Sequence, residues 1–369
     1  MGSAMDDAVR VGIIGCGKIA DVHLEVITTS PVARLVGVYD RDRRMANQAA
    51  QRFGVPAFDS LERWYAEARP EVVYITTLPT SHSELATQAL VRGCHVYVEK
   101  PFAMSFQEAK RVLDLAREMK KIVVCGYNAL YCRVMERARQ QIQSGQIGGR
   151  PFLIESYYAY PTEGTEYVRA MTGQPDHWVL SLPGGHIQNV ISHALAPIAE
   201  WMEGESPRVE VVAYSSWRYH NEGSRTAPTE LRAICYDGYN VTGMVVVSSR
   251  LAPPHFMAVN YRGANGDLWL DLSAQSLFVR EAKPHKSYLN YVLPNWRRGN
   301  QLRREAWLNL WELIRGRNHV RSGLICLTER FYHAVRANRP SPTPDELILR
   351  EMAMLDRIVE AIQSLSRGS

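Results

Sequence analysis

Apolar, β-branched runs alternate with amphipathic segments through the first 125 residues of the chain. The amphipathic segments are long enough for helices, and the apolar runs are typical of strands that are buried on both faces. This alternation predicts a parallel sheet covered by helices, and right-handed crossovers make it a doubly wound α/β fold of the Rossmann type. The predicted strands are RVGIIGCG (10–17), ARLVGVYD (33–40), EVVYITTLP (71–79), CHVYVEKP (94–101) and KIVVCGYN (121–128).

The pattern changes after Tyr131, where strands follow one another with few helices between them. Asp237-Gly238 and Asn265-Gly266 are predicted as tight turns. Strands joined in this way predict a second α/β domain with a mostly antiparallel, open sheet. We therefore expect two domains, 1–128 and 129–369, with C-terminal helices in 322–366 that pack back. The predicted strands of the second domain lie in FLIESYYAY (152–160), VEVVAYSSWRYH (209–220), TELRAICYDGYNVTGMVVVSS (229–249) and HFMAVNYRGANGDLWLDLSAQSLFV (255–279).

Composition narrows the class of protein. The chain has 369 residues, and its formal net charge of +5 is compatible with an anionic small ligand but too weak to indicate nucleic acid. The six cysteines are scattered without a C-x-x-C pair, so we expect no metal site and no disulfide framework. The sequence has no apolar run of ~18 residues and its first ten residues lack a secretory apolar segment, which together predict a cytoplasmic protein.

A glycine-rich motif joins the first strand to the helix that follows it. Gly15, Gly17 and Ala20 form the pattern G-x-G-x-x-A, in which the first glycine allows a tight turn and the second lets a pyrophosphate approach the backbone. The free amides at the start of the helix, from Cys16 to Ile19 and including Lys18, would then bind the phosphates.

Asp40 ends the second strand, 23 residues after Gly17, where a carboxylate can accept hydrogen bonds from both hydroxyls of a ribose. A carboxylate at this position repels a 2′-phosphate and so favours NAD over NADP. Arg41, Arg43 and Arg44 follow directly and leave NADP open as the alternative, because they could hold that phosphate.

Glu99-Lys100-Pro101 closes the CHVYVEKP strand, at the sheet edge where a nicotinamide is expected. With GIIGCGKIA and ITTLPTSHSELATQALVRGCHVYVEKP, and with the closing segment SGLICLTERFYHAVRANRPSPTPDELILREMAMLDRIVEAI, the chain resembles the Gfo/Idh/MocA oxidoreductase family along nearly its whole length. The resemblance implies a dinucleotide-binding domain followed by a substrate-binding domain, a catalytic Lys100 and a cis proline at Pro101. It also indicates cofactor contacts in the loop after the third strand and at the lysine, namely Thr77, Leu78, His82, Glu99 and Lys100.

The chemistry of hydride transfer favours Lys100 as a catalytic residue, independently of the family resemblance. Hydride leaves a carbinol carbon only as its hydroxyl loses a proton, and an ammonium near that oxygen stabilises the alkoxide by ~3–4 kcal/mol. Burial beside a positively charged nicotinamide should lower the pKa of Lys100 and ease proton transfer.

A second group of candidates lies in PGGHIQNVISHALAPI (183–198). Members of the family often have a glycine turn followed by D-x-x-x-H on a helix, and here Asn189 and His193 occupy these positions. Four-residue spacing places both side chains on one helical face, so His193 is the expected proton relay and Asn189 orients the hydroxyl. Asparagine carries no charge, which leaves the consequence for the reaction open. Further candidates for substrate contact are Tyr127, Asn128, Trp178 and His186, with Asp176 and His177 beside them.

A basic, aromatic stretch from Lys283 to Arg321 has helical apolar spacing at Leu302, Ala306, Leu310, Leu313 and Ile314. Three interpretations stay open: a helix docked through this face, an anion-binding flank for a phosphate or nucleotide-sugar, and contact with a membrane surface. We favour the docked helix and do not favour membrane contact.

Together these features predict an NAD(P)-dependent oxidoreductase that interconverts an alcohol and a ketone on a sugar, nucleotide-sugar or cyclitol. Two alternatives remain: a redox-neutral, NAD-assisted elimination, hydrolysis or epimerisation, and a non-catalytic protein that responds to a dinucleotide. By analogy with the family we expect a homodimer or homotetramer.

Overall fold

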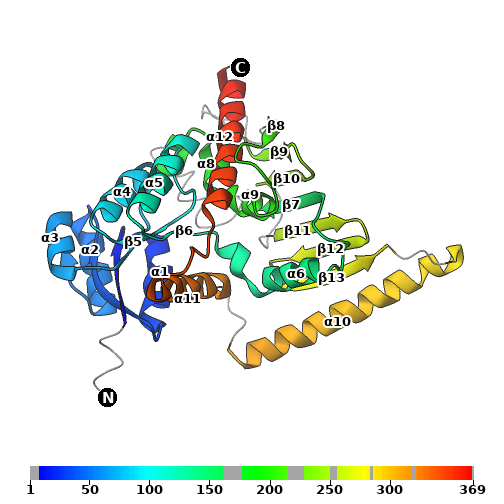
Figure 1. Ribbon diagram of the computed structural model, residues 1–369, viewed down its shortest axis with the longest axis horizontal. Coiled ribbons are helices and arrows are strands. Elements are labelled where there is room, and N and C mark those ends of the chain that lie inside the picture. Colours follow the sequence, from blue (N-terminus) through cyan, green and yellow to red (C-terminus); the bar gives the residue numbers. More distant parts are fainter. Residues whose placement is uncertain are drawn as a thin grey trace. The chain divides into compact units, whose positions relative to one another are not determined.

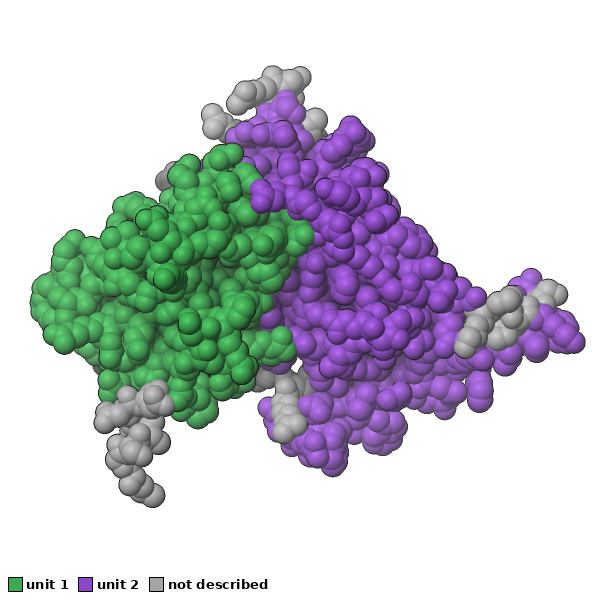
Figure 2. Space-filling model, viewed as in Figure 1, with its two compact units in different colours: residues 1–128, 324–352 green, residues 129–323, 353–369 purple. Residues whose placement is uncertain are grey.

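The chain divides into two compact units (Figure 2). The structure is a computed structural model, and it describes residues 8–160, 177–214, 228–249, 256–282, 286–316 and 321–367. Unit 1 comprises Met1–Asn128 and Leu324–Met352, and unit 2 comprises Ala129–Gly323 and Ala353–Ser369.

Unit 1 is built on a six-stranded parallel sheet with the strand order β3-β2-β1-β4-β5-β6. The order reverses between β1 and β4, which is the doubly wound arrangement predicted from the sequence. The prediction of this fold is confirmed, although it missed the two-residue strand β3. The strands are β1 (Val9–Ile14), β2 (Ala33–Tyr39), β3 (Ala57–Phe58), β4 (Val72–Ile75), β5 (His95–Val98) and β6 (Val123–Cys125).

The register aligns the carboxyl ends of five strands. Ile14 pairs with Tyr39 on one side and with Ile75 on the other, and the row continues to Val98 and Cys125. The residues that follow these strand ends therefore share one edge of the sheet, which is where open α/β sheets bind ligands.

Helices cover both faces of this sheet. In Figure 1, α4 and α5 lie on one side of the strands, and α1 and α11 on the other. The helices of this unit are α1 (Lys18–Thr29), α2 (Arg43–Phe53), α3 (Leu61–Ala68), α4 (His82–Val91), α5 (Phe106–Glu118) and α11 (Ser322–Ala337). Helix α12 (Asp345–Arg367) belongs to unit 1 up to Met352 and to unit 2 from Ala353.

The compact units differ from the predicted domains in one respect, because residues 324–352 group with the first unit. Phe331 and Tyr332 of α11 are fully buried, and their rings lie 6.5 and 6.4 Å from that of Tyr74 on β4. Asp345, at the start of α12, accepts a hydrogen bond of 3.0 Å from Arg117. Burial of these aromatic side chains against β4 holds the returning segment on the first sheet.

Unit 2 contains a seven-stranded sheet with the order β13-β12-β11-β7-β10-β9-β8. Only β7 and β10 pair in parallel, so the expectation of a mostly antiparallel sheet is confirmed. Residues 215–220 of the predicted strand 209–220 lie outside the described residues. The strands are β7 (Leu153–Ala159), β8 (Arg208–Tyr214), β9 (Glu230–Tyr236), β10 (Thr242–Ser248), β11 (Phe256–Gly263), β12 (Gly266–Asp271) and β13 (Ser276–Glu281).

The predicted turns of this sheet are found with one shift. Asp237 accepts backbone hydrogen bonds from residues 239–241, and Gly238 has a φ of 83°, so the turn between β9 and β10 lies where the sequence predicts it. The other turn consists of Ala264 and Asn265, because Gly263 pairs with Gly266 and both belong to strands. The remaining helices of the unit are α6 (Arg133–Gln143), α8 (Gly185–Val190), α9 (Ser192–Ala199) and α10 (Leu293–Ile314).

Substitution of Phe331 by alanine tests the role of α11 in unit 1. Removing a fully buried phenyl ring should lower the free energy of unfolding by about 3–5 kcal/mol. Denaturant unfolding followed by circular dichroism measures the change, with Val91→Ala as the control because Val91 is 60% exposed. Equal stability of the two variants would show that α11 does not belong to the core of unit 1.

Candidate active site

The turn after β1 requires glycine at position 15, because other backbone atoms lie close to it. Gly15 has a φ of 96°, and a Cβ at this position would lie 2.8 Å from backbone atoms of Thr76 and Thr77. Gly17 has the opposite property, since a Cβ there would meet nothing within 4 Å. The turn therefore packs tightly on the loop after β4 and leaves the start of α1 open at Gly17. No side chain of the described residues caps α1.

Asp40 stands beside this turn and is tied to it. Its carboxylate accepts hydrogen bonds of 2.7 Å from the backbone N–H groups of Cys16 and Asp42. The side chain is half-buried, and its oxygens keep further acceptor capacity. The sequence predicts Asp40 at this edge, and the structure adds that its carboxylate positions the glycine turn.

The cysteine within the turn is not a reactive thiol. Burial, followed by the negative charge of Asp40, raises the pKa of Cys16 to about 12. A protonated thiol at this position fits a structural role.

The three arginines that follow Asp40 lie on the surface of unit 1. Arg44 forms an exposed ion pair of 3.1 Å with Asp42, which caps α2, and Arg41 and Arg43 are exposed. Arg44 is thus engaged by a neighbouring carboxylate.

Lys100 follows β5 at the edge defined by the strand ends, and its peptide bond to Pro101 is cis. Burial lowers the pKa of Lys100, whereas the nearby acidic groups, Glu99 first and then Glu351, act in the opposite direction. A lysine with a lowered pKa at this edge can exchange a proton with a bound hydroxyl.

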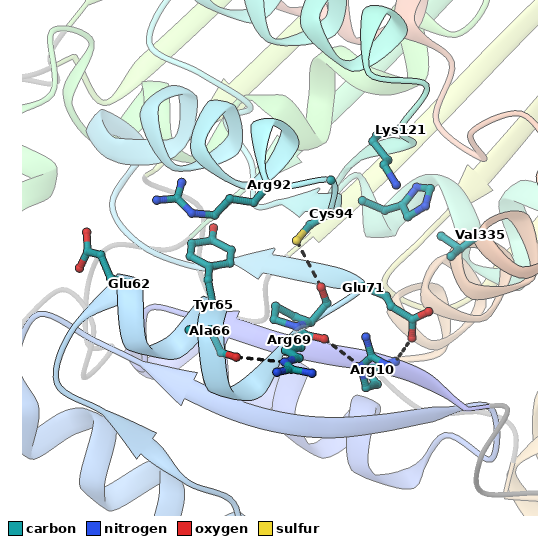
Figure 3. A pocket seen from close by; sticks show the side chains of 13 residues that line it. Arg10, Glu62, Tyr65, Ala66, Arg69, Glu71, Arg92, Cys94, Lys121 and Val335 are labelled. Carbon is teal, nitrogen blue, oxygen red and sulfur yellow. Dashed lines mark hydrogen bonds between the residues drawn. The ribbon is translucent and has the colours of Figure 1, made fainter.

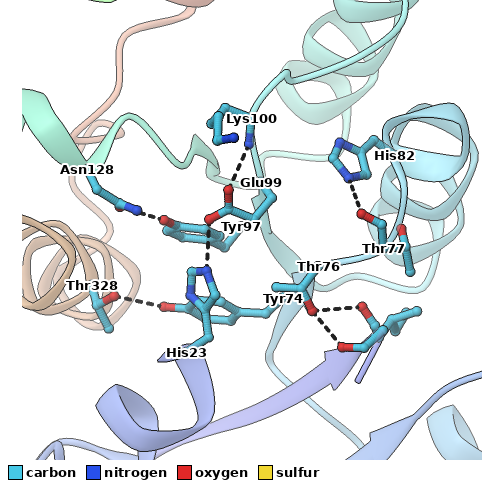
Figure 4. Close-up of polar contacts among 12 residues, drawn as sticks. His23, Tyr74, Thr76, Thr77, His82, Tyr97, Glu99, Lys100, Asn128 and Thr328 are labelled. Atoms are coloured by element: carbon cyan, nitrogen blue, oxygen red, sulfur yellow. Dashed lines mark hydrogen bonds and ion pairs between the residues drawn. The ribbon is translucent and has the colours of Figure 1, made fainter. Parts of the chain in front are cut away.

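Glu99 supports the lysine from below (Figure 4). Its side chain is buried, accepts a hydrogen bond of 3.2 Å from the backbone N–H of Lys100, and lies 2.8 Å from Nε2 of His23. Burial raises the pKa of Glu99, but the hydrogen bond and charge of His23 and the charge of Lys100 outweigh it, so the net effect is a lowered pKa. The side chain of Glu99 thus makes its contacts within unit 1, and its predicted cofactor contact stays a prediction.

His82 bridges the two loops that carry Thr77 and Lys100. Its Nδ1 lies 2.9 Å from the carbonyl oxygen of Pro101, and its Nε2 lies 3.1 Å from that of Thr77. Burial lowers the pKa of His82. Since both ring nitrogens contact protein carbonyls, the side chain positions these loops and does not present a nitrogen at the surface, whereas Thr77 and Leu78 remain half-exposed.

Tyr127 and Asn128 are likewise engaged within unit 1. The hydroxyl of Tyr127 donates to Glu351 at 2.9 Å, and Asn128 accepts from the hydroxyl of Tyr97 at 2.9 Å. Tyr127 is buried, with an exposed fraction of 2%. Its predicted contact with a substrate stays a prediction, and Asn128 is half-buried.

His23 and Glu351 were missed by the sequence analysis, although each carries a readable signal. His23 occupies the buried face of α1 together with Ala20 and Leu24, and Glu351 interrupts an apolar helical stripe on α12. Ionisable residues are rarely buried in such a stripe unless they are paired. Spacing alone did not reveal their partners, which come from distant parts of the chain.

The second group of candidates lies on α8 and α9 of unit 2. From Gly184 to Ala199, only Asn189 and His193 are not fully buried. Backbone hydrogen bonds and helical dihedral angles continue across Ile191 between the two helices, so the four-residue spacing is kept. Both side chains therefore open on one face, as predicted.

Aromatic rings hold the histidines of this group. His193 stacks on Tyr158 of β7 with a centroid distance of 5.3 Å, and the buried His186 lies 5.7 Å from the ring of Tyr160. At the start of α8, Gly184 donates to the side chain of Gln188 at 2.8 Å.

Trp178 begins a short 3-10 helix (Trp178–Ser181) that is capped by His177, whose ring accepts from the N–H of Val179. Trp178 is half-buried and stacks on the ring of His177. Asp176, the other candidate in this segment, lies outside the described residues.

A pocket of about 790 Å³ lies at the opposite, amino edge of the sheet of unit 1 (Figure 3). Arg10, Glu71, His95 and Lys121 line it, close to where β1, β4, β5 and β6 begin. It contains none of the predicted site residues, and its lining carries charges of both signs. The chemistry described above belongs to the carboxyl edge. Among the described residues, no group of three or more histidine, cysteine or acidic side chains could hold a metal ion.

Residues 9–127 match the model of an oxidoreductase family with an NAD-binding Rossmann fold. The chain is 32% identical to D-glucoside 3-dehydrogenase of Escherichia coli (strain K12) over 151 residues, which are 40% of this chain and 43% of that protein. It is 24% identical to inositol 2-dehydrogenase of Burkholderia cenocepacia (strain HI2424) over 261 residues, which are 66% of this chain and 73% of that protein. The chain thus spans less than half of the length of the first of these relatives.

The fold also occurs in a solved structure, the WlbA dehydrogenase from Bordetella pertussis in complex with NADH and UDP-GlcNAcA. The TM-score is 0.76 at 18% identity, and the match covers 97% of this chain and 96% of that one. At this level of identity the likeness shows the fold alone.

Substitution of Glu99 by glutamine tests the buried carboxylate under Lys100. The variant should lose about 1–3 kcal/mol of stability at pH 7, because a buried contact with His23 loses its charge. A carboxyl group with a lowered folded-state pKa stabilises fully above its unfolded pKa of about 4.3 and progressively less as the pH falls through its folded value.

The free-energy difference between wild type and Glu99→Gln should therefore shrink toward pH 3, as measured by denaturant unfolding across pH. Glu62→Gln, which changes an exposed carboxylate, is the matched control. A difference that is independent of pH would contradict a charged Glu99 in the folded protein.

Proposed function

We propose that this chain, whose residues 9–127 match the model of an oxidoreductase family with an NAD-binding Rossmann fold, is a Gfo/Idh/MocA-type NAD-dependent dehydrogenase of sugar-like alcohols. It would interconvert a secondary alcohol and a ketone on a sugar, nucleotide-sugar or cyclitol. The observation that carries the proposal is Lys100, whose burial lowers its pKa at the same sheet edge as the glycine turn and Asp40.

The residues at this edge fit a dinucleotide. The open surface at Gly17 and the uncapped start of α1 match a pyrophosphate. The remaining acceptor capacity of Asp40 matches the hydroxyls of a ribose. The nicotinamide would supply the acceptor or donor of the hydride. A carboxylate at Asp40 disfavours a 2′-phosphate, and the ion pair of Arg44 with Asp42 engages one of the arginines that could offset it.

Lys100 would act on the reacting oxygen. Its ammonium form stabilises an alkoxide, and its lowered pKa eases the exchange of a proton with the hydroxyl. Glu99 and His82 serve as positioning residues for the segment around Pro101, through the 3.2 Å and 2.9 Å hydrogen bonds described above.

His193 would exchange a proton with a substrate hydroxyl, because an imidazole titrates near neutral pH. Asn189 would orient that hydroxyl, since its amide can donate and accept hydrogen bonds but cannot change charge. The support is that these two side chains alone are left partly exposed between Gly184 and Ala199.

The substrate class rests on the relatives, which are named as dehydrogenases of a glucoside and of inositol. The solved structure of the WlbA dehydrogenase holds a nucleotide-sugar acid. Ring hydroxyls of a sugar or cyclitol are common to these names, and we propose that class for this chain.

Lys100→Met tests the proposed reaction. Loss of the ammonium should lower kcat/KM by about 10²–10³-fold, which is typical for removal of one group that stabilises an oxyanion. NADH formation at 340 nm across a panel of cyclitols, glucosides and nucleotide-sugars measures activity, and fluorescence titration measures NAD affinity. Lys121→Met, on the opposite edge of the sheet, should retain activity.

A Lys100→Met protein with wild-type kcat/KM would contradict the proposal. So would a wild-type protein that binds NAD but produces no NADH with any member of the panel.

Two substitutions of Asp40 separate its charge from its hydrogen bonds. Asp40→Ala should weaken NAD binding by at least about tenfold, because a ribose acceptor and the support of the glycine turn are both lost. Asp40→Asn keeps an oxygen for the N–H of Cys16 but removes the charge, so NADP should bind more tightly relative to NAD. Isothermal titration with both dinucleotides measures the ratio, and an unchanged ratio in both variants would place the ribose elsewhere.

A further inference from the structure

Helix α10 docks on unit 2 through its polar side. Gln301 exchanges hydrogen bonds of 2.8 and 3.2 Å with the backbone of Val279 on β13, and Asn309 donates to the carbonyl of Ala274 at 2.8 Å. Glu305 is 3% exposed and binds both terminal nitrogens of Arg137 at 2.6 Å. These side chains are four residues apart, so they form one face of the helix.

The opposite side of α10 is apolar and exposed. At 3.6 residues per turn, Trp296, Trp307, Leu310 and Ile314 fall within about 60° of one another and point away from Glu305. Their exposed fractions are 64%, 69%, 44% and 70%. The prediction that the apolar face of this helix is docked is therefore wrong, because the polar residues form the contacts with the sheet.

We call these four residues the aromatic face. Three residues just before the helix and three at its other angles are also more than 40% exposed, namely Tyr288, Tyr291, Val292, Leu302, Trp311 and Leu313. Several large apolar side chains exposed on one side of a helix indicate a binding surface.

The segment that carries the aromatic face is strongly basic. Residues 286–316 contain one lysine and five arginines against two glutamates, a net charge of +4. One of those glutamates is Glu305, which is already paired with Arg137. Arg297, Arg303 and Arg304 are exposed around the aromatic face. An occupant of this face must therefore bring negative charge together with apolar surface.

We propose that the aromatic face seats this protein on an anionic lipid surface. Tryptophan and tyrosine favour the boundary between headgroups and acyl chains, and arginines beside them pair with anionic headgroups. A second copy of the chain fits less well, because a symmetric contact would bring the arginines of two equal faces together. This reverses the preference drawn from the sequence, which assumed that the apolar face was buried.

The helix would lie in the plane of the interface. Among the described residues, the structure contains no helix that is long and apolar enough to span a membrane. Docking of α10 through Gln301, Glu305 and Asn309 leaves its aromatic face available while the helix stays attached to β13.

Vesicle flotation of the full chain tests the proposal. The protein should float with vesicles that contain phosphatidylcholine and about 30% phosphatidylglycerol at least about tenfold more than with phosphatidylcholine alone, since each arginine near an anionic surface adds to binding. High salt should reduce this binding.

Trp307→Ala/Ile314→Ala should lower binding to the anionic vesicles by at least about tenfold, because it removes two exposed apolar anchors. Arg303→Glu should lower it as well. The matched control is Val91→Ala/Phe152→Ala, which truncates two side chains that are 60% and 51% exposed on other elements. Circular dichroism checks that all variants are folded.

Absence of flotation, or equal flotation with both lipid mixtures, would overturn the proposal. Light scattering of the same variants measures oligomeric mass and so tests whether a second copy of this chain occupies the aromatic face. A fall in oligomeric mass for Trp307→Ala/Ile314→Ala, without any binding to vesicles, would assign the face to a second copy of this chain and would also overturn it.

Discussion

The buried carboxylate of Glu99, next to Lys100, makes the contacts on which the candidate site of unit 1 depends. Glu99 contacts His23 of α1 at 2.8 Å and the backbone of Lys100 at 3.2 Å, so it ties the first helix to the segment after β5. A buried charge is costly unless it is paired, and here pairing coincides with the sheet edge that carries the glycine turn. Burial lowers the pKa of this lysine, and the charge of Glu99 acts in the opposite direction.

The carboxyl edge of the sheet is assembled by small, specific contacts between loops. Asp40 holds the amide of Cys16, His82 bridges the carbonyls of Thr77 and Pro101, and Gly15 allows the loop after β4 to approach. The contacts of Asp40 and Gly15, and that of His82 with Pro101, join loops that follow different strands. These contacts fix the positions of the loops at the edge, and fixed charges and dipoles act on a reacting group without reorganisation.

Unit 2 contributes a different kind of surface. Asn189 and His193 open from an otherwise buried pair of helices, and His193 is held by its stacking on Tyr158. On the same unit, α10 exposes tryptophans and arginines and uses its polar side for docking. The protein therefore combines a candidate chemical site with a candidate attachment surface, and the two are built from separate elements.

The sequence by itself determined the features that depend on local pattern. Strand and helix alternation, the two glycines, Asp40 at a strand end and the four-residue spacing of Asn189 and His193 all follow from neighbours in the chain. Only the tertiary structure decided which distant groups meet: His23 with Glu99, Tyr127 with Glu351, and residues 324–352 with the first sheet. It also decided which face of α10 is docked, because periodicity identifies an apolar face but cannot say whether polar hydrogen bonds on the other side hold the helix instead.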